Sequence, residues 1–210
     1  MLVRLSLCCL LAGVSSGYAF DIDRDFFIDT GMSSLGAYLA PEVALGPNLS
    51  LRLPVYAAEL GSVSVNQRGT AFHGGLDSFQ GGVVLDYRPW ENGVFVSGGV
   101  LWGGYDFSGQ LREIDTGSGP VSGAFGFEVA QSQDVAPVVS VGYRYFSGSA
   151  FYAGVELGGK IATHTLHLTG LEALDSVDKR AVEVEQARIN ADLEEVSVVP
   201  FMTVSAGFAF

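Results

Sequence analysis

The stretch MTVSAGFAF, residues 202–210, decides the fold class of this chain. Apolar residues occupy its even positions, and small or hydroxyl-bearing residues occupy the positions between them. A period of two residues is typical of a β-strand whose two faces meet different surroundings. The chain therefore ends on a strand with one continuous apolar face, and the last residue of that face is the aromatic Phe210.

Seven earlier segments repeat this alternation in runs of about ten residues that are rich in glycine and aromatic residues. They cover residues 21–29, 35–46, 49–59, 79–88, 94–107, 135–146 and 151–167. Short turns follow the second, fourth and sixth segments, whereas longer links follow the first, third, fifth and seventh. Antiparallel membrane barrels show this asymmetry. The sequence therefore predicts eight antiparallel strands, with a bulge at Pro54 because proline removes one ladder hydrogen bond.

Residues 1–19 have the composition of a secretory signal peptide. Arg4 supplies one positive charge, an apolar run follows, and small residues close the segment at Ala19. The run is about half the roughly 20 residues that a membrane-spanning helix needs. We therefore expect cleavage after Ala19 rather than an uncleaved anchor. A lipoprotein site at Cys8 is rejected because Leu7 precedes it where a small residue is needed.

The mature chain, residues 20–210, is strongly acidic. Without Arg4 it keeps ten basic residues (11 − 1) against 23 acidic residues, a net charge of −13. This charge excludes nucleic acid as an expected partner, because phosphate binding needs Lys and Arg. Both cysteines, Cys8 and Cys9, lie in the signal peptide, so the mature chain forms neither a disulfide nor a thiolate metal site.

The chain is also hydrophobic, with 48% apolar residues. No apolar run after the signal peptide has the length of a membrane-spanning helix. In lipid, strands satisfy all their backbone groups only in a closed barrel. We therefore expect an all-β fold, an eight-stranded antiparallel transmembrane β-barrel. An exported, water-soluble β-sandwich would alternate in the same way, and composition does not separate the two.

Several segments resemble the CarO-type and OmpW-like small outer-membrane barrels of Gram-negative bacteria in their order and spacing. They are residues 86–90 (DYRPW), 93–99 (GVFVSGG), 134–137 (DVAP), 181–195 and 199–201 (VPF). The resemblance covers residues 35–210, while the first strand matches poorly and the first loop is shortened. It implies an outer-membrane barrel in contact with outer-membrane lipid, and its CarO branch implies passage of small basic amino acids.

The end of the chain carries a resemblance of its own. A last strand that closes on aromatic residues resembles the signal by which the barrel assembly machinery recognises outer-membrane proteins. This resemblance assigns the role of assembly signal to Phe208 and Phe210.

Charged residues gather on the inward faces of the predicted strands. They are Glu42, Arg52, Asp86, Arg88, Arg144, Glu156 and Lys160. One interpretation is a constriction that selects small cationic or zwitterionic solutes by pairing with their charges. The other is an ion-pair network that fills the lumen, since the interior of an eight-stranded barrel is just wide enough for side chains. The second is favoured, and a wide pore is not expected.

The three histidines, His73, His164 and His167, raise the question of catalysis. A few small barrels hydrolyse lipid A with a His and Ser pair, in which the His polarises the hydroxyl. Here no serine lies near His164 or His167, and no third group orients them, so no enzymatic activity is expected. A spacing of three places these two histidines on opposite faces of a strand, which disfavours a metal site. No cofactor is expected.

Residues 171–195 break the β period and predict an amphipathic helix in the last long loop. The apolar positions at helical spacing are Leu171, Leu174, Val177, Ala181, Val184 and Ala191. By strand parity this helix lies outside the cell, and the favoured interpretation is a solvated helix packed on the rim. The alternatives are a lid, an adhesive surface and an acidic funnel for cations. The funnel charges would be Glu172, Asp175, Asp178, Glu183 and Glu185.

Two functions remain open at this point. The first is an outer-membrane barrel that gives limited passage to small solutes, with basic amino acids implied by the resemblance. The second is a structural or surface-interaction barrel with a filled lumen and no transport. The sequence does not identify the solute.

Overall fold

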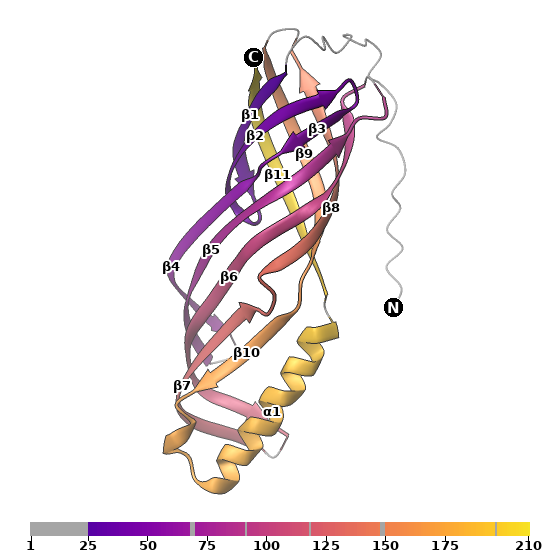
Figure 1. Cartoon of the computed structure of the whole chain (residues 1–210). Coiled ribbons are helices and arrows are strands. Elements are labelled where there is room, and N and C mark those ends of the chain that lie inside the picture. Colours follow the sequence, from indigo (N-terminus) through magenta and orange to yellow (C-terminus); the bar gives the residue numbers. More distant parts are fainter. Residues whose placement is uncertain (1–24, 68–69, 91, 118, 148–149, 196) are drawn as a thin grey trace, which may run out of the picture.

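The computed structural model describes residues 25–67, 70–90, 92–117, 119–147, 150–195 and 197–210. The predicted signal peptide lies outside these residues. Within them, the strands form one antiparallel sheet that closes on itself (Figure 1). Among the described residues the ring has eight strand positions, because β3 and β4 follow one another in the same place between β2 and β5. The predicted eight-stranded antiparallel barrel is confirmed.

The ring strands follow one another in space, and the last pairs with the first. They are β1 (Phe26–Ser33), β2 (Gly36–Gly46), β3 (Leu49–Arg52) with β4 (Val55–Gln67), β5 (Thr70–Tyr87), β6 (Val94–Thr116), β8 (Val135–Phe146), β9 (Phe151–Ile161) and β11 (Val198–Ala209).

The outward face of the ring is apolar. On β8, Val139 and Val141 are exposed while Ser140 between them is buried inside the ring. Large exposed aromatic residues mark two levels on the outside. Near the carboxyl terminus lie Phe26, Tyr87, Trp90, Tyr145, Phe151 and Phe210, and towards the other end lie Phe79 and Trp102.

The spacing of these two aromatic levels fits a bilayer. Tyr87 and Phe79 lie on β5, and the eight residue steps between them span about 27 Å of strand. At a tilt of ~40° this is about 20 Å along the barrel axis, close to the apolar band of membrane barrels, which aromatic girdles flank on both sides. The outer surface is therefore that of a transmembrane barrel.

Beyond Phe79, β4, β5 and β6 continue past the other strands of the ring. β7 (Gly119–Gln131) pairs with the distal half of β6, and β10 (His164–Thr169) pairs with β7. These five strand portions form the extension, which lies at the lower end of Figure 1, opposite the carboxyl terminus. The sequence missed β7, which was assigned to a long link, and extended the seventh strand to residue 167. In the structure β9 ends at Ile161 and β10 leaves the ring.

The extension has a hydrophobic core of its own, which η1 (Leu171–Ala173) and α1 (Ser176–Glu195) complete on their way back to β11. Its buried members are Ile114, Val121, Phe125, Phe127, Leu166, Leu168, Leu171 and Val182. The predicted helical loop is confirmed. No helix among the described residues is long and apolar enough to cross a membrane.

The apolar face predicted for the helix is only partly right. Val177 and Val184 are 75% and 65% exposed. The face that packs on the extension instead contains Val182, Ile189 and Leu193, spaced by seven and four residues. Both sets satisfy a helical period, so the sequence pattern gave two solutions and the shape of the extension core selected the second.

The side-chain amides of two residues on α1 form hydrogen bonds with the edge strand β10. The Asn190 Oδ1 atom accepts a hydrogen bond from the Leu166 N–H at 2.7 Å. Asn190 Nδ2 and Gln186 Nε2 both donate to the Leu166 carbonyl at 3.1 Å. The two side chains thus satisfy the edge backbone of β10 where a neighbouring strand would otherwise pair.

Replacing Asn190 with alanine should release the helix locally. The Leu166 N–H loses its partner in a partly buried place, at a cost of about 1–3 kcal/mol. Amide hydrogen exchange along α1 and β10 should accelerate about tenfold or more, while exchange in the ring strands stays unchanged. Ala187→Ser, at an exposed position on the same helix, is the matched control. Equal exchange in N190A and the wild type would show that the amide clamp does not hold the helix.

The first strand runs further than predicted, to Ser33 instead of Asp29. Gly31 was taken as part of a break after the strand. In the structure a Cβ at Gly31 would lie 2.1 Å from the carbonyl oxygen of Val204. Glycine is therefore needed inside the strand, because it lets β1 and β11 approach each other. Residues 21–24 of the predicted strand lie outside the described residues.

The link from β1 to β2 is a two-residue turn, Ser34 and Leu35, and not one of the longer loops. Leu35, the first residue of the predicted segment 35–46, is buried in the barrel core because it belongs to the turn and not to the strand.

The bulge predicted at Pro54 is also absent from the described pairing. Glu42 faces Arg52 and Leu39 faces Val55, which is one unbroken register across the proline. The chain tolerates Pro54 because its carbonyl still accepts a hydrogen bond from the Gly82 N–H at 2.9 Å.

Candidate functional site in the barrel lumen

The seven charged residues predicted to face inward are all buried in the structure. Their exposed fractions lie between 0% and 6%. Asp29 on β1, which the sequence analysis did not single out, joins them at 1% exposure. Seven of these eight residues form one ion-pair network, the plug. Its members are Asp29, Glu42, Arg52, Asp86, Arg88, Arg144 and Glu156.

One bridge of the plug crosses the full width of the barrel. Arg52 on β3 donates to both carboxylate oxygens of Glu156 on β9, at 2.6 and 2.9 Å. β3 holds the third position in the ring and β9 the seventh, so the two residues come from opposite walls. Arg52 also pairs with Asp86 at 3.1 Å. A bidentate arginine–carboxylate pair of this kind has a defined geometry as well as a strong attraction.

A second bridge also joins opposite walls. Arg144 on β8, the sixth ring position, donates to both oxygens of Glu42 on β2, the second position, at 2.6 and 3.0 Å. Arg144 also pairs with Asp29 at 3.2 Å and with Asp86 at 3.3 Å. Each guanidinium therefore serves several carboxylates, which is how buried charges avoid being left unpaired.

Hydroxyls and aromatic rings complete the environment of the plug. Ser97 donates to Asp86 at 2.6 Å, and Ser140 donates to Glu156 at 2.5 Å. The Phe95 ring lies 5.8 Å from the guanidinium carbon of Arg52 and 4.9 Å from that of Arg144. Rings at such distances attract a guanidinium through their negative faces. Serine hydroxyls and an aromatic ring therefore contact the plug alongside its ion pairs.

Lys160 lies apart from the plug, near the extension. Its ammonium donates to the side-chain carbonyls of Gln80 and Gln131 at 2.7 and 2.6 Å, and lies 5.3 Å from the centre of the Tyr105 ring. Among the described residues no carboxylate lies within ion-pair distance of it. The plug holds four carboxylates against three arginines, a net charge of −1, so Lys160 balances the lumen charge only from a distance.

His164 continues this polar layer outside the membrane-spanning part of the wall. Its Nε2 atom lies 2.6 Å from the Tyr105 hydroxyl, and the two rings stack at 5.1 Å. Burial, with a smaller contribution from the charge of Lys160, lowers the pKa of His164 below its ordinary value. His164 is buried and His167 is exposed, so the two histidines lie on opposite faces of β10 as predicted.

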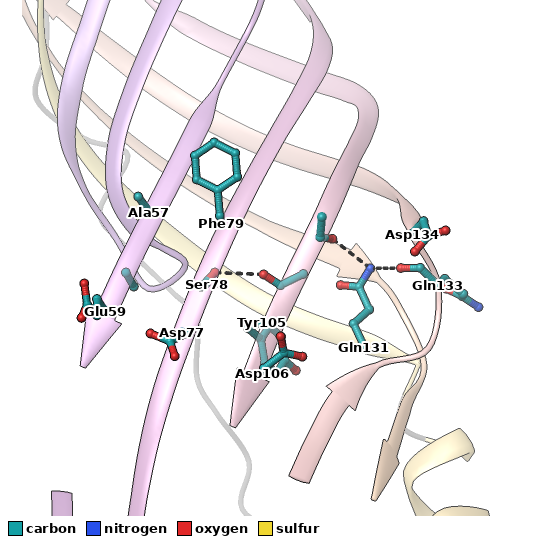
Figure 2. Close-up of a pocket in the computed structure, with 13 residues that line it drawn as sticks. Ala57, Glu59, Asp77, Ser78, Phe79, Tyr105, Asp106, Gln131, Gln133 and Asp134 are labelled. Atoms are coloured by element: carbon teal, nitrogen blue, oxygen red, sulfur yellow. Dashed lines mark hydrogen bonds between the residues drawn. The ribbon is translucent and has the colours of Figure 1, made fainter. Parts of the chain in front are cut away.

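An open hollow of about 650 Å³ lies where β6 leaves β8 and joins β7 (Figure 2). Gly103 makes this change of partner with a φ of 83°, which glycine adopts without strain. Gln131 lines the hollow, donates to the Gly103 and Gln133 carbonyls, and accepts from Lys160. This side chain therefore connects the hollow with Lys160 in the lumen.

Four of the 13 residues that line this hollow are acidic. Glu59 faces Asp77 across β4 and β5, and Asp77 faces Asp106 across β5 and β6. Asp134 lines the hollow as well. Three carboxylates directly opposite one another on neighbouring strands repel. The hollow therefore carries a strongly negative potential beside the aromatic level of Phe79 and Trp102.

The sequence pattern found seven of the inward charges but missed Asp29 and the neutral partners of Lys160. Asp29 follows the two-residue alternation of β1, since Phe26 and Ile28 are exposed on the other face. The sequence therefore contained a signal that Asp29 faces inward. Gln80 lies inward on β5, but nothing in its sequence position indicated that it accepts a hydrogen bond from Lys160. Gln131 lies on the unpredicted β7, and nothing in its local sequence indicates that it reaches Lys160.

The fold and the buried charges define a class of protein: a small transmembrane β-barrel with a lumen filled by ion pairs. No family model matches the chain, and no curated protein matches it. Two crystal structures from Acinetobacter baumannii share its fold. CarO is 18% identical over 89% of this chain and 98% of its own, with a TM-score of 0.62. CarO2 is 16% identical over 89% and 99%, with a TM-score of 0.64. The predicted resemblance to CarO-type barrels is confirmed at the level of the fold.

Proposed function

We propose that this protein is an outer-membrane β-barrel whose lumen is closed at rest by the plug and which presents the extension at the cell surface. The observation that carries this proposal is the pair of bridges between opposite walls, Arg52 to Glu156 and Arg144 to Glu42. Side chains that touch across the full width of the ring leave no column of water at that level. The apolar outer face with its two aromatic levels supports the membrane location. The short turns beside the carboxyl terminus support an orientation in which that end faces the periplasm and the extension faces outward.

A second candidate is limited passage of small solutes, with basic amino acids as the cargo. This candidate is supported by the composition of the plug, which is formed by side chains and not by a folded domain. A cationic or zwitterionic solute offers the same charged groups and can exchange with the plug ion pairs one at a time. The excess of one carboxylate in the plug favours cations. Opening still requires separating buried pairs, at a cost of about 3–5 kcal/mol for each pair broken, so passage is slow.

Planar bilayer recordings of the purified mature protein test the closed barrel. The wild type should show no conductance steps. The double substitution Arg52→Ala and Glu156→Ala removes one complete bridge and its side-chain volume, so discrete steps should appear. The control is Glu185→Ala with Arg188→Ala, an ion pair of 2.8 Å within α1, outside the lumen, and it should stay silent. Steady conductance of the wild type would overturn the closed barrel.

Proteoliposome uptake tests the second candidate. Passage of basic amino acids predicts that labelled arginine enters faster than an uncharged sugar of similar size, and that Glu42→Gln slows arginine alone. Equal rates for both solutes, at the level of empty liposomes, would exclude passage and leave the closed barrel as the function.

A further inference from the structure

Four side chains from four strands meet at the junction where the extension leaves the ring. They are Tyr105 on β6, Gln131 on β7, Lys160 on β9 and His164 on β10. β9 ends at Ile161 and β10 begins at His164. Lys160 therefore lies just before the point where the chain leaves the ring, and His164 lies just after it. We call these four residues the junction layer.

Contacts of the Tyr105 ring and the Gln131 side chain hold the junction layer together (Figure 2). The Tyr105 hydroxyl lies 2.6 Å from His164 Nε2, and its ring stacks on the imidazole at 5.1 Å between the ring centres. The Lys160 ammonium lies 5.3 Å from the centre of the same tyrosine ring and donates a hydrogen bond to Gln131 at 2.6 Å. The layer therefore ties β7 and β10 of the extension to β6 and β9 of the ring.

Two of the four side chains can carry a positive charge, and both are buried. Lys160 and His164 are 0% and 6% exposed. Among the described residues neither forms an ion pair, and the groups that accept hydrogen bonds from Lys160 are the neutral amides of Gln80 and Gln131. Of the charged groups on the elements packed around His164, Lys160 acts on its charge, while Asp106 is exposed on the other face of β6. A second positive charge in the layer would therefore be buried without a counter-charge.

Protonation of His164 creates this second charge. A neutral imidazole can accept a hydrogen bond from the Tyr105 hydroxyl at Nε2, but a protonated one carries a hydrogen there. Burial, and to a smaller extent the charge of Lys160, lowers the pKa of His164. The contribution of the layer to stability is therefore complete above about pH 6.5, the ordinary value for histidine, and is lost as the pH falls through the lower value in the folded protein. Acid thus favours arrangements in which His164 reaches water.

We propose that the junction layer is an acid-sensitive latch, which holds β10 and α1 against the ring while His164 is neutral and releases them when it is protonated. α1 moves with β10, because Asn190 and Gln186 are hydrogen bonded to the Leu166 backbone. The latch lies apart from the plug, so it stands whether or not the lumen conducts. It makes the position of the extension relative to the ring depend on the pH of the medium.

Spin-label distance measurements on the purified mature protein in detergent test the latch. Both cysteines of the chain lie within residues 1–19. Leu39→Cys on the outside of β2 and Ala187→Cys on α1, both exposed, therefore supply the two label sites. At about pH 7.5 the distance between the labels should be narrowly distributed. Below about pH 6.5 the distribution should broaden, with the same midpoint as the His164 ring signals in an NMR titration.

Three variants of the labelled protein sharpen the test. His164→Gln keeps a hydrogen-bonding side chain but cannot titrate, so its distance distribution should not depend on pH. Lys160→Met removes the neighbouring charge at a similar side-chain length, so the midpoint of His164 should move upward. His167→Gln is the matched control on the exposed face of the same strand, where His167 faces Glu128 of β7, and it should leave the response unchanged. Heat-modifiable migration on gels shows that each variant is folded.

A response that is lost in His164→Gln and kept in His167→Gln supports the latch. A distance distribution that stays the same between about pH 8 and pH 4 would overturn it. A response that persists in folded His164→Gln would assign the pH dependence to another group and overturn the latch as well. The NMR titration gives a test without any variant at position 164, because a His164 midpoint at or above about 6.5 would mean that the layer does not resist its protonation.

Discussion

Alanine in place of Arg144 is expected to destabilise the folded barrel by about 3–5 kcal/mol. The guanidinium is buried and pairs with Glu42, Asp29 and Asp86. Among the described residues, its removal leaves Glu42 with one arginine, Arg88, and takes away the ion pair of Asp29. An unpaired buried carboxylate carries the full cost of its desolvation. The variant should therefore unfold at a much lower urea concentration than the wild type.

Urea titration of the refolded protein in detergent, followed by the heat-modifiable gel shift, measures this loss. Arg188→Ala is the matched control because this side chain is 70% exposed and forms an ion pair with Glu185, a residue of the same helix. An exposed pair contributes about 0.2–1 kcal/mol. If R144A and R188A unfold together, the plug is not a buried network and the lumen is hydrated.

The plug residues share their ion-pair partners. Three arginines serve four carboxylates, and each arginine carboxylate contact lies between strands that are far apart in sequence. Alanine substitutions within the plug should be non-additive, because residues of one network share partners. Removing Arg52 after Arg144 should cost less than removing it first.

The period of two residues predicted most of the barrel correctly because the two faces of each wall strand meet different solvents. Val139 and Ser140, or Phe79 and Gln80, are neighbouring apolar and polar residues in the sequence, and the structure places them on opposite faces. The inward charges followed from the same parity. Lipid on one side and a packed lumen on the other impose the alternation, so the pattern is strong wherever the strand crosses the membrane.

The extension could not be predicted in the same way because both of its faces meet protein or water. In β7, Val121, Phe125 and Phe127 alternate, but small residues between them gave the segment the composition of a loop. Its strand conformation is decided by β6, β10 and α1, which are distant in sequence. Gln131 illustrates the consequence for the site: its role depends on Lys160, 29 residues away.

A lipid-facing charge gives the other large expected effect, and it tests the membrane placement directly. Val139→Arg puts a guanidinium on the outward face of β8, between the two aromatic levels. At the middle of a bilayer this costs about 2–4 kcal/mol in a membrane barrel. In water the same substitution on an exposed strand position would stay within about 0.5 kcal/mol.

Val184→Arg is the matched control for this experiment. Val184 is 65% exposed and Val139 is 57% exposed, so an exposure argument alone predicts equal, small effects. The two positions differ in their surroundings, since Val184 lies on α1 of the extension. Unfolding in phosphatidylcholine vesicles should therefore show a large loss for V139R and almost none for V184R. Equal losses of stability in the two variants would mean that the outer face of β8 meets water. The protein would then be a water-soluble barrel and not a transmembrane one. A loss confined to V139R fixes the lipid on the ring and the water on the extension, which is the division on which the closed transmembrane lumen depends.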